Sequence, residues 1–316
     1  MLCDALAEMV LKRRIGEIGE DGLGEFARRQ MDAARSDPRL GRERGAVLAD
    51  FWDAVEEAER VRMLGILGMH ELAAVLDREE QRLGVSRDQP DLSPDTAARL
   101  QAFWERSEMA RLELTNGNPH LNAQALISMN SALDALVEEL APAVRDVRRR
   151  RLAEAMLSDV KARVPAFAEL ADEVRETIEG VVEDFIDDRL PKAERLRESG
   201  ARRYERVLEG AGLAAPRDRP IPPDLDCALT ELGALRDVLI HRGGRVDARA
   251  LRQAPSLMYG DGQMVRMSDA DFRTYSAAVR CYAAEVQYRL IRGWIELPDE
   301  DAPDLARWRD YRRLGA

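Results

Sequence analysis

The stretch that decides the fold reads Leu235-Arg236-Asp237-Val238-Leu239-Ile240-His241-Arg242-Gly243-Gly244. Apolar residues recur here at helical spacing and predict one buried helix face; they are Leu232, Leu235, Leu239 and Ile240. The two glycines predict the end of this helix, because glycine adopts the left-handed backbone conformation at little cost. His241, one of only three histidines in the chain, is therefore expected at the C-terminal end of a helix.

The same helix carries an arginine and a histidine separated by four residues, Arg236 and His241, with Asp237 directly after the arginine. This pattern resembles the signature of the HEPN superfamily, a group of all-α nucleases and nucleotide-binding modules. The segment 125–140 also resembles the first core helix of that family, with Asp134 at the acidic position after Ser-Ala-Leu. The resemblance runs from about Asn118 to the C-terminus. It implies that Arg236 and His241 are catalytic. It also implies that Asp237 orients one of them and that Asp134 holds Arg236.

These residue types suit the cleavage of RNA by its own 2′-hydroxyl. The reaction needs a base, an acid and positive charge around the phosphorus, and it does not require a metal. Histidine titrates near neutral pH, and arginine grips phosphate oxygens with two donors. We also expect Asn130 to contact substrate, because it lies four residues before Asp134 and so shares its helix face. Arg242 and Arg245, on either side of the glycines, are further candidates for substrate binding.

The spacing of Arg236 and His241 raises a geometric problem. Five residues of an ideal helix turn through about 500°, which leaves the two side chains roughly 140° apart. Either the helix unwinds at His241, or two chains combine their motifs about a twofold axis. The family resemblance implies the second arrangement, an active homodimer. In the alternative interpretation, His241 only caps the helix and Arg236 pairs with a surface carboxylate. The chain is then a non-catalytic module that binds a nucleotide or a protein.

Composition narrows the fold and function classes. Of 316 residues, 45% are hydrophobic, 34% charged and 5% aromatic, which favours an all-α bundle of long surface helices. The net charge of −11 argues against a general binder of duplex DNA. Three distant cysteines predict neither a zinc site nor a disulfide framework, and we expect no cofactor. The few, distant cysteines favour a reducing compartment, so the expected location is the cytoplasm. The apolar runs are too short to cross a membrane.

Turn residues divide the predicted helices into two regions. Thr115-Asn116-Gly117-Asn118-Pro119 is the expected boundary between an N-terminal helical region of unknown role, residues 1–117, and a HEPN-like helical domain, residues 118–316. The segments 257–259 and 264–267 flank Gly260-Asp261-Gly262 and predict a small β-hairpin insertion. Ser268 is expected to cap a last long helix.

Two clusters of charged residues lie outside the motif. The arginines of the run 145–151 either form a solvated face or contact RNA phosphates. The acidic cluster Glu183, Asp184, Asp187 and Asp188 is interpreted as a solvated face rather than a magnesium site. The sequence hypothesis is therefore a metal-independent endoribonuclease, as in a toxin or an antiviral-defence effector. Such an enzyme needs a protein partner that neutralises or activates it.

Overall fold

The computed structural model describes residues 41–86, 89, 91–163, 176–177, 180–181, 200–292 and 304–309. Helices account for 79% of these residues and no named strand is among them, so the prediction of an all-α chain is confirmed. In chain order the helices are α3 (Gly41–Ala73), α4 (Val75–Leu83), α5 (Pro94–Thr115), α6 (Pro119–Arg163), α8 (Gly200–Ala211), α9 (Pro223–His241), α10 (Ala248–Gln253) and α11 (Asp269–Arg292). A short 3₁₀ turn follows at 305–309.

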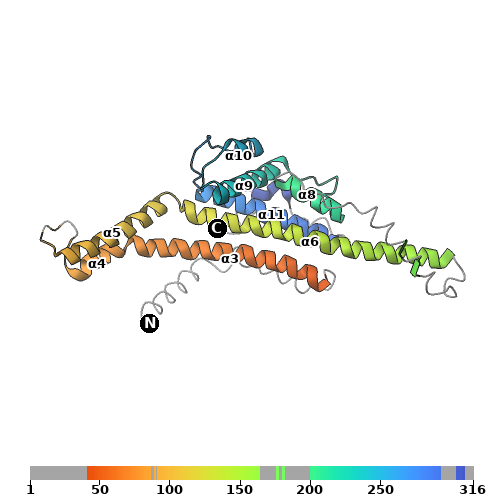
Figure 1. Cartoon of the computed structure of the whole chain (residues 1–316), viewed down its shortest axis with the longest axis horizontal. Coiled ribbons are helices and arrows are strands. Elements are labelled where there is room, and N and C mark those ends of the chain that lie inside the picture. The colour runs from red at the N-terminus through yellow and green to blue at the C-terminus, as the bar shows by residue number, and fades with distance from the viewer. Residues whose placement is uncertain are drawn as a thin grey trace.

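The molecule is elongated, and its two longest helices, α3 and α6, lie side by side along it (Figure 1). Helices α8, α9 and α11 pack on α6, and α10 packs on α9. Helices α4 and α5 continue one end of α3 as an arm. The long axis of the molecule therefore follows the 33 residues of α3 and the 45 residues of α6.

The core forms where the apolar stripe of α6 meets α3. The predicted stripe is buried throughout; it consists of Leu126, Met129, Leu133, Leu136, Val137 and Leu140. Phe51, Trp52 and Val55 of α3 belong to the same continuous core, as do apolar residues of α8, α9 and α11. The predicted boundary near residue 117 falls at the α5–α6 turn, and the regions on its two sides share this one core.

Helix α11 is enclosed by the other helices, and its residues from Phe272 to Tyr288 are buried almost without a break. Two of its buried arginines form ion pairs. Arg280 Nη2 lies 2.6 Å from Glu59 Oε1 of α3, and Arg289 Nε lies 2.8 Å from Glu285 Oε1. Isolated buried charges would be strongly destabilising, so these pairs allow a partly polar helix to occupy the centre of the molecule.

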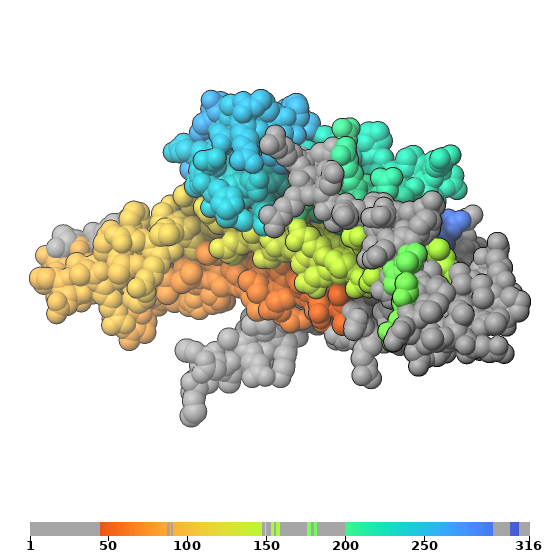
Figure 2. Space-filling model, turned by 45° about the vertical axis from the view of Figure 1, so that its right-hand side comes forward, coloured from red at the N-terminus to blue at the C-terminus, as the bar shows by residue number. Residues whose placement is uncertain are grey.

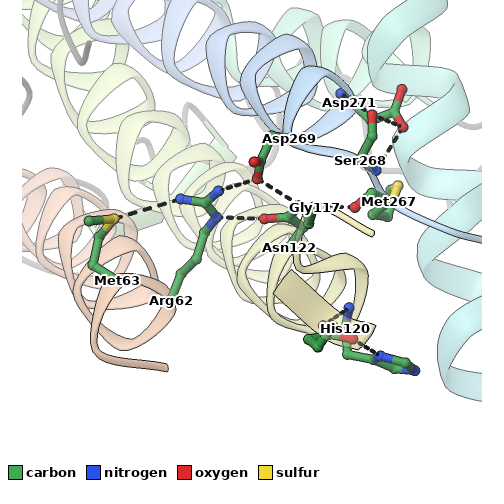
Figure 3. Close-up of polar contacts among 10 residues, drawn as sticks. Arg62, Met63, Gly117, His120, Asn122, Met267, Ser268, Asp269 and Asp271 are labelled. Carbon is green, nitrogen blue, oxygen red and sulfur yellow. Dashed lines mark hydrogen bonds and ion pairs between the residues drawn. The ribbon is translucent and has the colours of Figure 1, made fainter. Parts of the chain in front are cut away.

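The corner between α5 and α6 is fixed by side chains from three helices (Figure 3). Asn122 Nδ2 donates to the carbonyl oxygens of Gly117, at 2.7 Å, and Met267, at 2.9 Å. Arg62 of α3 donates to Asn122 Oδ1 and to Asp269 Oδ1, both at 2.6 Å. These bonds join α3, the start of α6 and the start of α11.

The predicted β-hairpin insertion is wrong. The segment 262–265 pairs instead with the residues after the double glycine. Val246 N donates to Gln263 O at 2.9 Å, and Val265 N donates to Gly244 O at 2.8 Å. Only one isolated bridge results, between Arg245 and Met264. The turn at 260–263 exists, but the residues after it form backbone hydrogen bonds with 244–246 and not with 257–259. This pairing buries both Val246 and Val265.

Candidate functional site

Helix α9 ends at the double glycine, as predicted. Its last residue is His241, and Gly243 and Gly244 have φ angles of 59° and 77°. The carbonyl oxygen of Val238 accepts from Arg242 N at 2.9 Å and from Gly244 N at 3.1 Å. Since backbone N–H groups already satisfy this carbonyl, no capping bond from the His241 side chain is needed to end the helix.

One part of the predicted apolar face of α9 is wrong. Leu232 and Leu235 are fully buried, but Ile240 is 44% exposed and Val238 is buried instead. Ile240 lies five residues after Leu235, which rotates it roughly 140° away from the stripe. The exposed Ile240 therefore stands beside His241 at the surface.

His241 is exposed and lines a groove of about 400 Å³ between α9 and α10. The polar residues of the groove are Asp237, His241, Arg242, Asp247, Arg249 and Gln253. The imidazole makes no hydrogen bond or ion pair with another described residue. It is therefore free to meet a ligand that enters the groove.

Arg236 does not line this groove. Its Nη1 lies 4.0 Å from Asp134 Oδ2 of α6 and 3.5 Å from Asp237 Oδ1. Helix α9 is regular through His241, so the helix does not unwind to bring the two motif residues together. Within one chain, Arg236 faces α6 and His241 faces α10.

Asp134 is held by helix α8. Tyr204 donates to Asp134 Oδ1 at 2.7 Å, and Arg203 Nη1 approaches the same oxygen at 3.4 Å. Burial, and then the Asp134 carboxylate, raise the pKa of Tyr204 well above its usual range. The tyrosine hydroxyl therefore stays a hydrogen-bond donor at any physiological pH. Sequence reasoning missed Tyr204; the only signal for it is its position four residues before the buried Leu208 on an amphipathic helix.

The three predicted substrate-binding residues are spread out. Asn130 is 3% exposed and lies inside the core, out of reach of a ligand in this arrangement. Arg242 is exposed and lines the groove, where its Nε lies 3.4 Å from Asp247 Oδ2. Arg245 is exposed and donates to Gly262 O at 3.2 Å. Only Arg242 therefore shares the groove with His241.

The segment that carries the groove is richer in arginine than in acidic residues, although the chain as a whole is acidic. Residues 236–266 contain six arginines and three aspartates, against a net charge of −11 for the chain. Five of the arginines are exposed; they are Arg242, Arg245, Arg249, Arg252 and Arg266. Figure 2 shows the α10 region, in cyan and light blue, projecting from the body of the molecule. This projection presents locally positive charge, which attracts phosphate groups.

Helix α10 contributes residues that sequence reasoning missed, Arg249 and Gln253. Asp247 caps this helix by accepting from Ala250 N at 2.8 Å. That bond, followed by the nearby arginines, lowers the pKa of Asp247. The sequence signal for helix α10 is the capping Asp247. The placement of this helix beside His241 depends on tertiary packing, which the sequence pattern does not show.

The other predicted features lie elsewhere. Arg145 and Arg149 are half-buried on α6, whereas the side chains of Arg148, Arg150 and Arg151 and the whole acidic cluster 183–188 lie outside the described residues. In the described parts of the chain no three His, Cys, Asp or Glu side chains are grouped as metal ligands. None of the helices described is long and apolar enough to cross a membrane.

Comparisons of the chain with protein-family models, with curated proteins and with solved structures find no match.

Proposed function

We propose that the chain is a metal-independent endoribonuclease of the HEPN type, with His241 at its reactive centre. The observation that carries this proposal is an exposed, unbonded histidine in a groove that also contains the exposed arginines Arg242 and Arg249. Arginines attract and hold RNA phosphates, and the imidazole can transfer protons at neutral pH. The resemblance of Arg236, Asp237, His241 and Asp134 to the family pattern supports the same function.

His241 would act in the transfer of the 2′-hydroxyl to the adjacent phosphorus. The 2′-hydroxyl loses its proton to a base, such as water, as a new 2′-oxygen–phosphorus bond forms. The bond to the 5′-oxygen breaks and that oxygen gains a proton, so the products are a 2′,3′-cyclic phosphate and a 5′-hydroxyl. A histidine near the scissile phosphate can serve as the general acid of this reaction, so His241 is assigned to protonate the leaving 5′-oxygen.

A homodimer would bring the complete motif together. Arg236 and His241 face different sides of α9, so one chain does not place both at a single phosphate. Two chains related by a twofold axis would place Arg236 of one protomer near His241 of the other. Sedimentation across a concentration series tests this arrangement. A monomer that is fully active at all concentrations contradicts it.

A non-catalytic binding module is the second candidate function. The observation in its favour is that Arg236 is already engaged by two carboxylates, Asp134 and Asp237. In this case the groove binds a nucleotide or a partner and turns nothing over. A nuclease of this type would also need a neutralising or activating protein, whereas a binding module would not.

The test compares the wild-type chain with His241→Ala on cellular RNA in EDTA, with analysis of product ends. His70→Ala is the matched control, because His70 is also exposed but lies on α3. Cleavage by the wild type and the control alone, leaving cyclic phosphate ends, supports the nuclease. Equal cleavage by all three chains rejects the role of His241. Binding of RNA without cleavage favours the second candidate.

A further inference from the structure

The charges of the His241 groove are not equivalent, because most of them are already paired. The carboxylate of Asp237 lies 3.5 Å from Arg236, and that of Asp247 lies 3.4 Å from Arg242. Arg249 is held less closely. Its side chain is exposed, and its charge acts on the Asp247 carboxylate, but the ion pair of that carboxylate at 3.4 Å is with Arg242. Arg249 is therefore the arginine of the groove that a ligand meets without breaking an ion pair of this kind.

We infer that Arg249 and Gln253 of α10 form a phosphate-binding subsite that holds the RNA backbone against His241 of the same chain. The motif arginine, Arg236, faces α6 and cannot do this within one chain. The inference rests on the proposed function in naming RNA as the ligand. It goes beyond that function in placing the phosphate contact on a residue outside the motif.

The position of α10 supports this assignment. The Asp247 cap fixes the start of the helix, and the buried Ala250 anchors it against α9. Arg249 and Gln253 are four residues apart, so they lie on one helix face, and both line the groove. Arg252 is exposed on the same helix but does not line the groove. The structure therefore supplies two arginines three residues apart, of which only one faces His241.

The chemistry of the subsite suits a phosphodiester. A guanidinium donates two parallel hydrogen bonds to phosphate oxygens, and these charge-assisted bonds are about twice as strong as neutral ones. The carboxamide of Gln253 can donate to a third oxygen or to a ribose hydroxyl. A phosphate held in this way would lie beside the exposed imidazole of His241, which lines the same groove.

The experiment measures binding separately from cleavage. A fluorescent 2′-O-methyl oligoribonucleotide lacks the attacking hydroxyl, so its affinity is obtained from anisotropy without turnover. We expect Arg249→Ala to weaken binding by about tenfold, the loss typical of one charge-assisted contact. Arg249→Lys should recover part of the affinity, and Arg252→Ala should change it by less than about twofold. Thermal unfolding of each variant checks that the fold is intact.

The outcomes separate the subsite from the nuclease. Equal losses in Arg249→Ala and Arg252→Ala would mean general electrostatic attraction and would overturn the subsite. So would a wild-type chain that does not bind the oligonucleotide. Binding that depends on Arg249, in a chain that cleaves no RNA, supports the subsite and rejects the nuclease. Cleavage that is unchanged in Arg249→Ala, with unchanged binding, leaves the nuclease and rejects the subsite.

Discussion

At the scale of single residues, the motif is supported by a tyrosine from another helix. Tyr204 bonds one oxygen of Asp134, and the other oxygen of that carboxylate faces Arg236. The hydroxyl thus limits how the carboxylate can rotate. The orientation of Arg236 therefore depends on three helices, α6, α8 and α9, rather than on the motif alone.

Replacing Tyr204 by phenylalanine measures how much its hydrogen bond to Asp134 contributes to stability. Asp134 is 15% exposed and would lose its shortest hydrogen bond, so we expect the free energy of unfolding to fall by about 1–3 kcal/mol. Urea unfolding measures the change. Tyr259→Phe is the control, because Tyr259 is only half-buried and its hydroxyl bonds the backbone of Arg266 rather than a carboxylate. Equal losses in both variants would contradict the importance of the Asp134 contact.

The buried tyrosines also predict how stability depends on pH. The pKa values of Tyr204 and Tyr282 are both raised well above 10.0, first by burial and then by a neighbouring carboxylate. In the unfolded chain both ionise near pH 10. The folded chain then holds more protons, so stability is complete below about pH 10 and is lost as the pH rises further.

The slope of that loss can be assigned to individual residues. Each tyrosine contributes about 1.4 kcal/mol per pH unit above the unfolded pKa. Tyr204→Phe removes one of these contributions. Its free energy of unfolding should therefore decline less steeply than that of the wild type between about pH 10 and 11, in matched urea titrations. Parallel declines would contradict a protonated Tyr204 in the folded chain.

At the scale of elements, the sequence correctly predicted those helix features that depend on residue spacing and local backbone preference. The buried stripe of α6, the end of α9 at its glycines and the Ser268 cap of α11 follow from spacing and backbone preference. The predicted hairpin was wrong because residues 262–265 form their backbone hydrogen bonds with residues 244–246 instead of with 257–259. Arg249 was missed because its distance from His241 depends on how α10 packs, which no local pattern encodes.

The two glycines after α9 should differ in their tolerance of a side chain. Both have positive φ, so alanine at either position is strained by about 1–2 kcal/mol. A β-carbon at Gly244 would also come within 3.0 Å of Met264 Sδ, whereas at Gly243 it would meet open space. We expect Gly244→Ala to lower the melting temperature more than Gly243→Ala. The reverse order would contradict the described pairing of 244–246 with 262–265.

At the scale of the whole molecule, the N-terminal helices and the motif region share one hydrophobic core. The α6 stripe is covered on one side by α3, and Arg280 of α11 is neutralised by Glu59 of α3. The resemblance to a known family covers only the second region, so sequence reasoning could not assign a task to the first. In the structure, helix α3 of this first region forms part of the hydrophobic core.

Removing residues 1–117 should therefore unfold the rest. The fragment 118–316 would expose the apolar face of α6 and lose the Glu59 carboxylate that pairs with Arg280. We expect circular dichroism to show no cooperative thermal transition for the fragment, whereas the full chain unfolds in one. A fragment that melts cooperatively at the temperature of the full chain would refute the shared core.

The corner in Figure 3 also has a consequence for the time at which the chain folds during its synthesis. Arg62 bonds Asp269, which lies 207 residues later in the chain. Contacts of such long range form slowly, because the intervening chain must first be ordered. The N-terminal helices emerge from the ribosome long before α11 does. Until α11 is made, these helices lack the partners that the corner supplies, so we expect a polypeptide truncated before residue 269 to be unstable.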